Sequence, residues 1–119
     1  MRRYTIKTKR RDNPEGRTQL AILQMLRTLG YACGKTKTMG VRVGNLYRFD
    51  LYTFRGFPDL TAFMPEVVFI EVKSKKGRLS KDQKVFQELC EKAKTPYIVA
   101  RSTDDVKEYL MKRGKLWKL

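Results

Sequence analysis

The sequence predicts a mixed α/β fold built as a single domain. Two patterns predict it: three segments carry apolar residues at helical spacing, and short apolar runs bounded by turn residues lie between them. The chain has 119 residues, and a chain of this length can bury a core without disulfides or structural metal. Residues 1–14 are rich in Arg and Lys and indicate a basic arm, so we expect the folded domain to span residues 15–119.

The first and last helices are predicted from their apolar spacing and end signals. The first runs from about Arg17 to Leu29, because leucines recur there every three residues and Gly30 can end the helix. The last begins within Ser102–Asp105, whose side chains are common helix caps, and ends at Gly114.

A middle helix is predicted from Ser80 to about Ala93. Ser80 and Gln83 have the spacing of a capping box, in which each side chain hydrogen-bonds the backbone of the other residue. The predicted inward face of this helix carries Val85, Phe86, Leu89 and Cys90.

Five short runs are predicted strands. They are Val41–Val43, Leu46–Phe49, Leu60–Phe63, Val67–Lys73 and Tyr97–Ala100. The first two flank Gly44-Asn45, a dipeptide that favours a two-residue hairpin. The third and fourth are joined by a Met-Pro-Glu turn. The last is wholly apolar, as expected of a strand that is covered on both faces.

The net charge of +15 indicates a polyanionic partner. Acidic residues are scarce where basic ones are frequent: between Gly16 and Pro58 the only acid is Asp50. Self-repulsion of so much positive charge destabilises a compact fold, whereas nucleic acid as a partner accounts for it. A protein that is merely basic, like many small ribosomal or viral proteins, is the alternative.

The residue types that are missing exclude several kinds of site. The chain has no histidine, and its only two cysteines, Cys33 and Cys90, lie far apart in the sequence. Zinc fingers, histidine acid–base catalysis and Ser-His-Asp triads are therefore excluded. No apolar run is long enough to cross a membrane, and no secretory signal is expected. We expect a cytoplasmic protein, in the host cell if it is viral.

Two carboxylates and a lysine meet at the ends of two predicted strands. Asp59 precedes the third run, and Glu71 and Lys73 end the fourth, so a hairpin of the two runs brings Asp59 close to Glu71. Mg²⁺ and Mn²⁺ prefer carboxylates with carbonyl oxygens and water, and the Val72 carbonyl is the candidate third protein ligand. In a chain this basic, the expected substrate is a phosphodiester. The alternative is an ordinary surface pair of Glu71 and Lys73, with Asp59 as a turn residue.

Three motifs carry a resemblance to a known nuclease superfamily. They are Gly56-Phe57-Pro58-Asp59-Leu60, Val68-Phe69-Ile70-Glu71-Val72-Lys73-Ser74 and Leu79-Ser80-Lys81-Asp82-Gln83. With these motifs the chain resembles the PD-(D/E)XK nucleases, and within them the VRR-NUC (virus-type replication-repair nuclease) domains, over roughly residues 15–110. The resemblance implies a restriction-endonuclease-like αβββαβ core with a mixed central sheet flanked by helices.

The resemblance also implies roles for single residues. Asp59 and Glu71 would be metal ligands, Lys73 the catalytic lysine, and Gln83 the glutamine that starts the following helix. A glutamate of the first helix usually completes such sites through a metal-bound water, and Glu15 is the candidate. Both of the last two have plainer explanations, Gln83 as a capping-box residue and Glu15 as an acid favoured by the helix dipole.

Cations around these residues are candidates for contacts with the DNA backbone. They are Arg55, Lys75, Lys76 and Arg78 near the site, with Arg10 and Arg11 in the basic arm. A solvated basic loop is the alternative for those after Lys73. Aromatic residues interleaved with arginines could stack on unpaired bases, although alternating strand aromatics commonly belong to the core. They are Tyr47, Tyr52, Phe54 and Phe57.

The expected function is that of a Mg²⁺- or Mn²⁺-dependent DNA endonuclease that recognises duplex or branched DNA, such as a Holliday junction, by structure. Stand-alone, phage-type members of the family resemble Holliday-junction resolvases. They are expected to act as homodimers, because a two-fold pair has two sites for two strands. Flap- or nick-directed nucleases and sequence-reading restriction enzymes are alternatives. A non-catalytic basic DNA- or RNA-binding protein on a degenerate nuclease scaffold is the alternative from another class.

Overall fold

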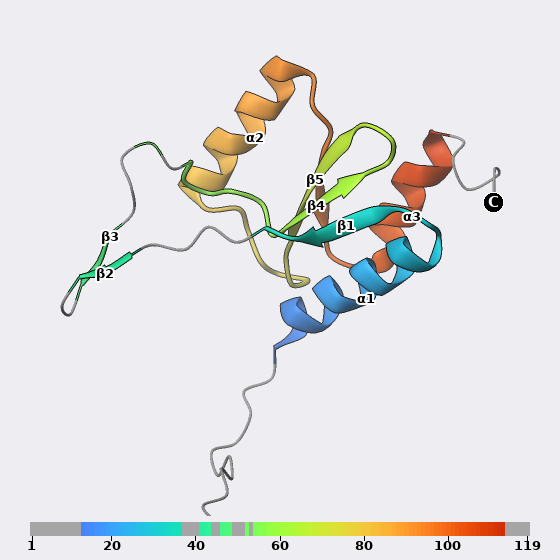
Figure 1. Ribbon diagram of the computed structural model, residues 1–119, viewed down its shortest axis with the longest axis horizontal. Coiled ribbons are helices and arrows are strands. Elements are labelled where there is room, and N and C mark those ends of the chain that lie inside the picture. The colour runs from blue at the N-terminus through green and yellow to red at the C-terminus, as the bar shows by residue number, and fades with distance from the viewer. Residues whose placement is uncertain (1–12, 37–40, 44–45, 49–51, 53, 114–119) are drawn as a thin grey trace, which may run out of the picture.

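A computed structural model of the chain has a four-stranded sheet between helices (Figure 1). It describes residues 13–36, 41–43, 46–48, 52 and 54–113. The described helices are α1 (Pro14–Thr28), α2 (Lys81–Ala93) and α3 (Thr103–Lys112). The described strands are β1 (Ala32–Lys35), β2 (Val41–Val43), β3 (Leu46–Arg48), β4 (Leu60–Phe63), β5 (Val67–Val72) and β6 (Tyr97–Ala100). The predicted mixed α/β class is confirmed.

The main sheet is mixed, with the strand order β1-β4-β5-β6. β4 is antiparallel to both β1 and β5, whereas β6 runs parallel to β5. A parallel step needs a crossover connection, and α2 supplies it between β5 and β6. The β4–β5 hairpin pairs Leu60 with Ile70 and Phe63 with Val67. The residues just before Leu60 therefore lie beside those just after Ile70.

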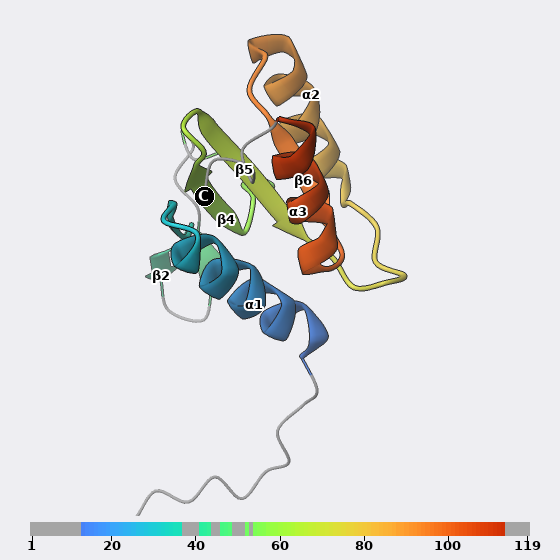
Figure 2. The same ribbon diagram turned by 90° about the vertical axis from the view of Figure 1, so that its right-hand side faces the viewer.

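One face of the sheet is covered by α1 and α3, which lie side by side (Figure 2). Alternate strand residues point to this face, because successive side chains of a strand face opposite sides. The buried core here consists of Ile22, Leu23, Leu26, Leu60, Ala62, Met64, Val68, Ile70, Val72, Ala100, Val106 and Leu110. This packing fixes the β4–β5 hairpin and so holds the residues on its other face in place.

The opposite face is covered by α2 through an aromatic cluster. The ring centroids of Phe57, Phe69 and Phe86 lie 5.0 to 5.5 Å apart in edge-to-face arrangements. The prediction for the inward face of α2 is only half right. Phe86 is buried as predicted, and so is Cys90, but Val85 and Leu89 are 51% and 43% exposed. The contact stripe of α2 is narrow, and each of these two residues is rotated by about 100° from its buried neighbour.

The strand β1 is not predicted by the sequence pattern. Ala32–Lys35 contains no β-branched residue, yet all four residues pair with β4, so tertiary pairing overrides weak strand propensity. The predicted hairpin exists as β2 and β3, but among the described strands these two pair with each other alone, in a separate sheet. These two predicted strands therefore lie outside the central αβββαβ core, whose three strands between α1 and α2 are β1, β4 and β5. Gly44, Asn45 and Phe49 lie outside the described residues.

The start of α1 differs from the prediction and places Glu15 inside the helix. α1 begins at Pro14, earlier than predicted, because the Asn13 side chain accepts a 2.9 Å hydrogen bond from Gly16 N and caps the helix. Glu15 thus lies in the first turn of α1. Gly114 and the basic arm up to residue 12 lie outside the described residues. In the part of the chain that is described, no helix has the length and apolarity needed to cross a bilayer.

Candidate active site

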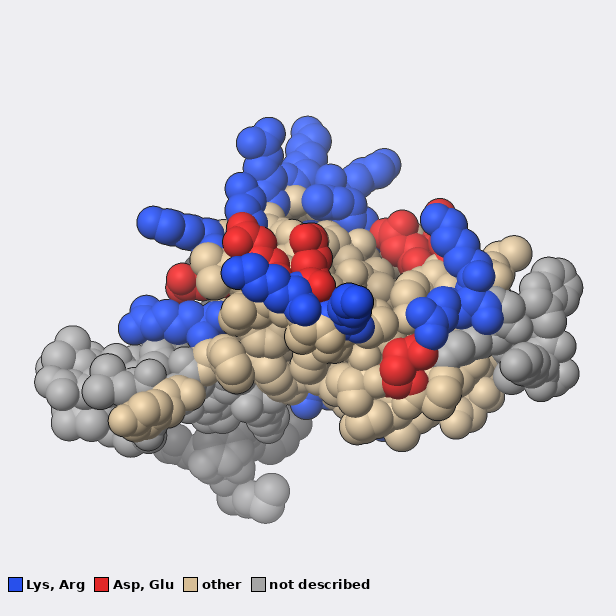
Figure 3. All heavy atoms as spheres, turned by 90° about the horizontal axis from the view of Figure 1, so that it is seen from above, with Lys and Arg blue, Asp and Glu red and all other residues tan. Residues whose placement is uncertain are grey.

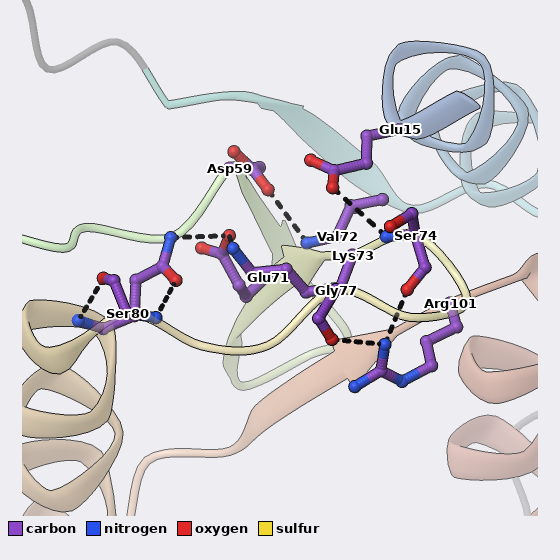
Figure 4. A network of polar contacts seen from close by, with 10 residues as sticks. Glu15, Asp59, Glu71, Val72, Lys73, Ser74, Gly77, Ser80 and Arg101 are labelled. Carbon is purple, nitrogen blue, oxygen red and sulfur yellow. Dashed lines mark hydrogen bonds and ion pairs between the residues drawn. The ribbon is translucent and has the colours of Figure 1, made fainter. Parts of the chain in front are cut away.

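The β4–β5 hairpin places Asp59 beside Glu71 at one end of the sheet. Because Leu60 pairs with Ile70, the next residues outward on the two strands are Asp59 and Glu71, with their side chains on the face that α2 covers. Asp59 Oδ2 accepts a 2.9 Å hydrogen bond from the backbone N–H of Val72. Figure 4 shows the two carboxylates next to each other, which is the arrangement that the spacing of the two runs predicts.

Glu71 is the most enclosed charged residue of the described chain, with 2% of its surface exposed. Its Oε2 accepts a 3.0 Å hydrogen bond from Gln83 Nε2 and lies 3.7 Å from Lys73 Nζ. Its Oε1 is buried and has no hydrogen-bond partner among the described residues. A buried carboxylate oxygen without a donor is costly, so this side of Glu71 favours either a proton on the carboxyl, beside Asp59, or a bound cation.

The protonation of Glu71 is shifted by its surroundings. Burial, and then repulsion from the Asp59 carboxylate, raise the pKa of Glu71 to about 8, while Lys73 acts in the opposite direction. The protein alone therefore favours the neutral form of this carboxyl at neutral pH. A buried carboxyl group whose pKa is raised by a second carboxylate is typical of functional sites.

Gln83 both caps α2 and contacts a carboxylate of the site. Its backbone N–H donates to Ser80 Oγ at 3.2 Å, and its Oε1 accepts from Ser80 N at 2.8 Å, which completes the predicted capping box. The Nε2 of the same side chain donates to Glu71. One amide thus starts α2 and orients a site carboxylate.

Glu15 reaches the site from α1 without joining the two carboxylates. Its Oε2 accepts a 3.2 Å hydrogen bond from the backbone N–H of Ser74, the residue that follows Lys73 (Figure 4). Among the described residues, no three acidic or cysteine side chains form a group that could hold a metal ion. The role of Glu15 through a metal-bound water stays a prediction, and its observed contact fastens the end of β5 to α1.

Arg101, directly after β6, is a neighbour of the site that no pattern in the sequence indicates. Its Nη1 donates to the carbonyl oxygens of Ser74 at 2.6 Å, Gly77 at 2.7 Å and Lys75 at 3.3 Å. These bonds hold the loop between β5 and α2 against the end of β6 (Figure 4). The contacts span more than twenty residues of sequence, so no local pattern could have indicated them.

Exposed cations surround this loop. The predicted DNA contacts Arg55, Lys75, Lys76 and Arg78 are all exposed, as are Lys81, Lys84 and Arg101. On the face seen in Figure 3, Lys and Arg side chains crowd along one edge, with acidic side chains between them. Arg10 and Arg11 lie outside the described residues, so their contact with DNA stays a prediction.

Residues 52–104 match the family model of the VRR-NUC domain. These residues carry a VRR-NUC domain. A solved structure described as a VRR_NUC domain shares the fold, with a TM-score of 0.61 and 22% sequence identity over 85% of this chain and 97% of that chain. No curated protein matches the chain.

The VRR-NUC domain implies a nuclease-type function and, with it, a nucleic-acid partner. The PD-(D/E)XK assignment is consistent with this family. The matched segment contains the two carboxylates, Lys73, Gln83 and Arg101, whereas Glu15 lies before its first residue.

The oxygen atoms that these residues offer would fit a hard divalent cation. Asp59 and Glu71 offer carboxylates, and Val72 offers a backbone carbonyl, which are the donors that Mg²⁺ and Mn²⁺ prefer. A cation at the carboxylates would satisfy Glu71 Oε1, which is buried without a partner in the described structure. It would also offset the repulsion that raises the pKa of Glu71.

We expect the metal-free protein to lose stability as the pH rises from about 5 to 8. Over this range folded Glu71 keeps a proton that the unfolded chain has lost, because its pKa is about 8 in the fold against an ordinary 4.5. The unfolding free energy then falls by at most about 1.4 kcal/mol per pH unit. The chain has no histidine to mask the effect. Thermal melts in EDTA at a series of pH values measure the loss. Glu71→Gln should make the stability nearly independent of pH over this range. Equal pH dependence of the wild type and Glu71→Gln would contradict the raised pKa of Glu71.

Proposed function

We propose that this chain is a Mg²⁺- or Mn²⁺-dependent endonuclease that hydrolyses phosphodiester bonds in duplex or branched DNA, by preference at Holliday junctions. The observation that carries the proposal is the enclosed Glu71, with one oxygen unpartnered in the described structure, beside Asp59 and 3.7 Å from Lys73. A protein that only binds DNA has no use for two carboxylates facing phosphate.

Each residue of the site has its own task in this proposal. Asp59 and Glu71, with the Val72 carbonyl, would hold the metal, which when bound supplies an activated water and neutralises charge on the phosphate. Lys73 would orient the attacking water or offset charge on the scissile phosphate. Gln83 keeps the Glu71 carboxylate in one orientation through its 3.0 Å hydrogen bond.

The charge of the chain supports DNA as the substrate and structure as the basis of selection. The net charge is +15, and the exposed cations next to the site suit phosphate contacts, which carry no sequence information. Selection would then depend on the shape of the DNA. A homodimer would present two such sites to two strands, as a four-way junction requires.

The test is a cleavage assay with the purified chain on supercoiled plasmid, a four-way junction, a flap, a nicked duplex and an intact linear duplex. Each substrate is incubated with Mg²⁺, Mn²⁺ or EDTA. We expect cleavage with either metal, none in EDTA, and the four-way junction cut symmetrically and fastest. Preferential cleavage of the flap or nick would replace the junction preference, and binding without cleavage in either metal contradicts the enzyme assignment.

A further inference from the structure

Phe54 presents an exposed aromatic ring whose position is fixed by other rings. Its side chain is 61% exposed, although it contacts two members of the aromatic cluster. It stacks on Phe57 with ring centroids 6.4 Å apart and planes inclined by 13°, and it meets Phe86 edge to face at 5.7 Å. An aromatic ring held on one side and open on the other is a surface on which a further flat group can stack.

The rings that support Phe54 are next to the site residues. Phe57 lies two residues before Asp59, and Phe69 lies two residues before Glu71 on the same face of β5. Phe86 lies three residues after Gln83, one turn along α2. The cluster thus forms a wall beside the two carboxylates, and Phe54 is its exposed end.

The backbone beside Phe54 is tightly seated. Gly56 has φ +69, and a Cβ built on it would lie 2.4 Å from the carbonyl carbon of Asp82 in the first turn of α2. Only a residue without a side chain can come so close. Because the segment is held in this way, a ligand that stacks on Phe54 costs little additional ordering of the protein.

The charges around the ring suit a nucleotide. Arg55 follows Phe54 directly, and Lys81 stands in the first turn of α2; both are exposed. Asp82, also exposed, is the acidic group of that turn. Cations next to an exposed ring are the combination that binds single-stranded nucleic acid, the cations on phosphates and the ring on a base. A paired base in intact duplex is stacked between its neighbours, so it cannot use such a ring.

We propose that Phe54 is a stacking platform for an unpaired nucleobase of branched DNA, next to the phosphate that the carboxylates act on. Its place beside the scissile bond rests on the proposed function, whereas the stacking itself does not. This contact would give the site a means to distinguish branched DNA from intact duplex without reading sequence. Among the aromatic side chains that the sequence indicates as possible base contacts, Phe54 is exposed and supported by other rings, whereas Phe57 is packed within the aromatic cluster.

Affinity measurements on two DNAs that differ in one base test the proposal. In a series of labelled flaps or junctions, a single unpaired thymine is placed at each position within about three nucleotides of the branch. Each DNA is paired with a second one that carries an abasic site in place of that thymine. Dissociation constants are measured in EDTA, so that cleavage plays no part. Phe54→Ala should weaken binding of the thymine DNA by roughly 5- to 150-fold, the range of base–aromatic stacking, and should leave binding of the abasic DNA unchanged.

Two variants and one direct probe complete the design. Phe63→Ala is the matched control, because Phe63 is 52% exposed at the end of β4 remote from Asp59, and it should leave both affinities unchanged. Phe54→Trp should keep the preference for the thymine DNA. Irradiation with 5-iodouracil at the sensitive position should cross-link the DNA to the peptide that contains Phe54.

Several outcomes would overturn the proposal. Equal weakening of thymine, abasic and fully paired DNA by Phe54→Ala would make the ring a structural support only. A change in sedimentation of the free protein on Phe54→Ala would instead make Phe54 part of a contact between copies of this chain. Equal affinity of the wild type and Phe54→Ala for the thymine DNA would refute the platform alone, whereas stacking observed with a protein that never cuts would refute the proposed function alone.

Discussion

Asp59→Asn should abolish DNA cleavage while leaving the fold and DNA binding intact. The substitution removes one of the two negative charges that would hold the divalent cation, and we expect the rate to fall on the order of a thousandfold or more. Asn keeps an oxygen that can accept the 2.9 Å hydrogen bond from Val72 N, so the end of β5 stays in place. Single-turnover cleavage of a four-way junction measures the rate, and binding in EDTA measures the affinity.

The controls separate loss of metal from loss of structure and from a change in charge. Asp59→Ala should cut no better than Asp59→Asn but should melt earlier, because it leaves the N–H of Val72 without its acceptor. Glu88→Gln raises the net charge by the same amount from an exposed position on α2, and it should cut normally. If Asp59→Asn and Glu88→Gln cleave equally well, Asp59 has no place in the site.

Gly56→Ala should be among the most destabilising single substitutions in the chain. A Cβ there would lie 2.4 and 2.5 Å from the carbonyl atoms of Asp82 and 2.6 Å from Gln83 N, all of them backbone atoms that cannot turn aside. The φ of +69 adds a second penalty for any side chain. We expect the free energy of unfolding to fall by about 3 kcal/mol or more, which corresponds to a fall in melting temperature of roughly 10 °C.

Gly30→Ala is the matched control for that prediction. Gly30 also has a positive φ, of +93, but nothing lies within 4 Å of a Cβ built on it. Its substitution therefore measures the conformational penalty alone, about 1 kcal/mol. Melting temperatures of the two variants give the comparison. The close approach of Gly56 to α2 is disproved if both cost the same.

Much of the fold follows from local patterns, and the exceptions share a cause. The capping box at Ser80 and the apolar runs of β4, β5 and β6 carry their own signals, so these elements lie where they are predicted. β1 has no such signal, because Ala32–Lys35 becomes a strand only through pairing with β4. The hairpin at 41–48 has strong strand residues, but a pattern of propensity does not reveal which sheet a strand joins.

The same division holds for the site. The sequence predicts that Asp59 lies beside Glu71, because a short hairpin fixes the register between the two strands. The hydrogen bond from Ser74 N to Glu15 joins residues 59 positions apart, and Arg101 reaches its three carbonyls from beyond α2. Contacts of this kind depend on how the helices pack on the sheet, which no local spacing encodes.

The Gln83 side chain links the order of the site to the local unfolding of the first turn of α2. Helix ends open far more often than whole domains unfold. When the first turn of α2 opens, the bonds between Ser80 and Gln83 break, and Glu71 loses its amide donor in the same event. The stability of the first turn of α2 therefore sets the fraction of molecules in which Gln83 holds the Glu71 carboxylate in place.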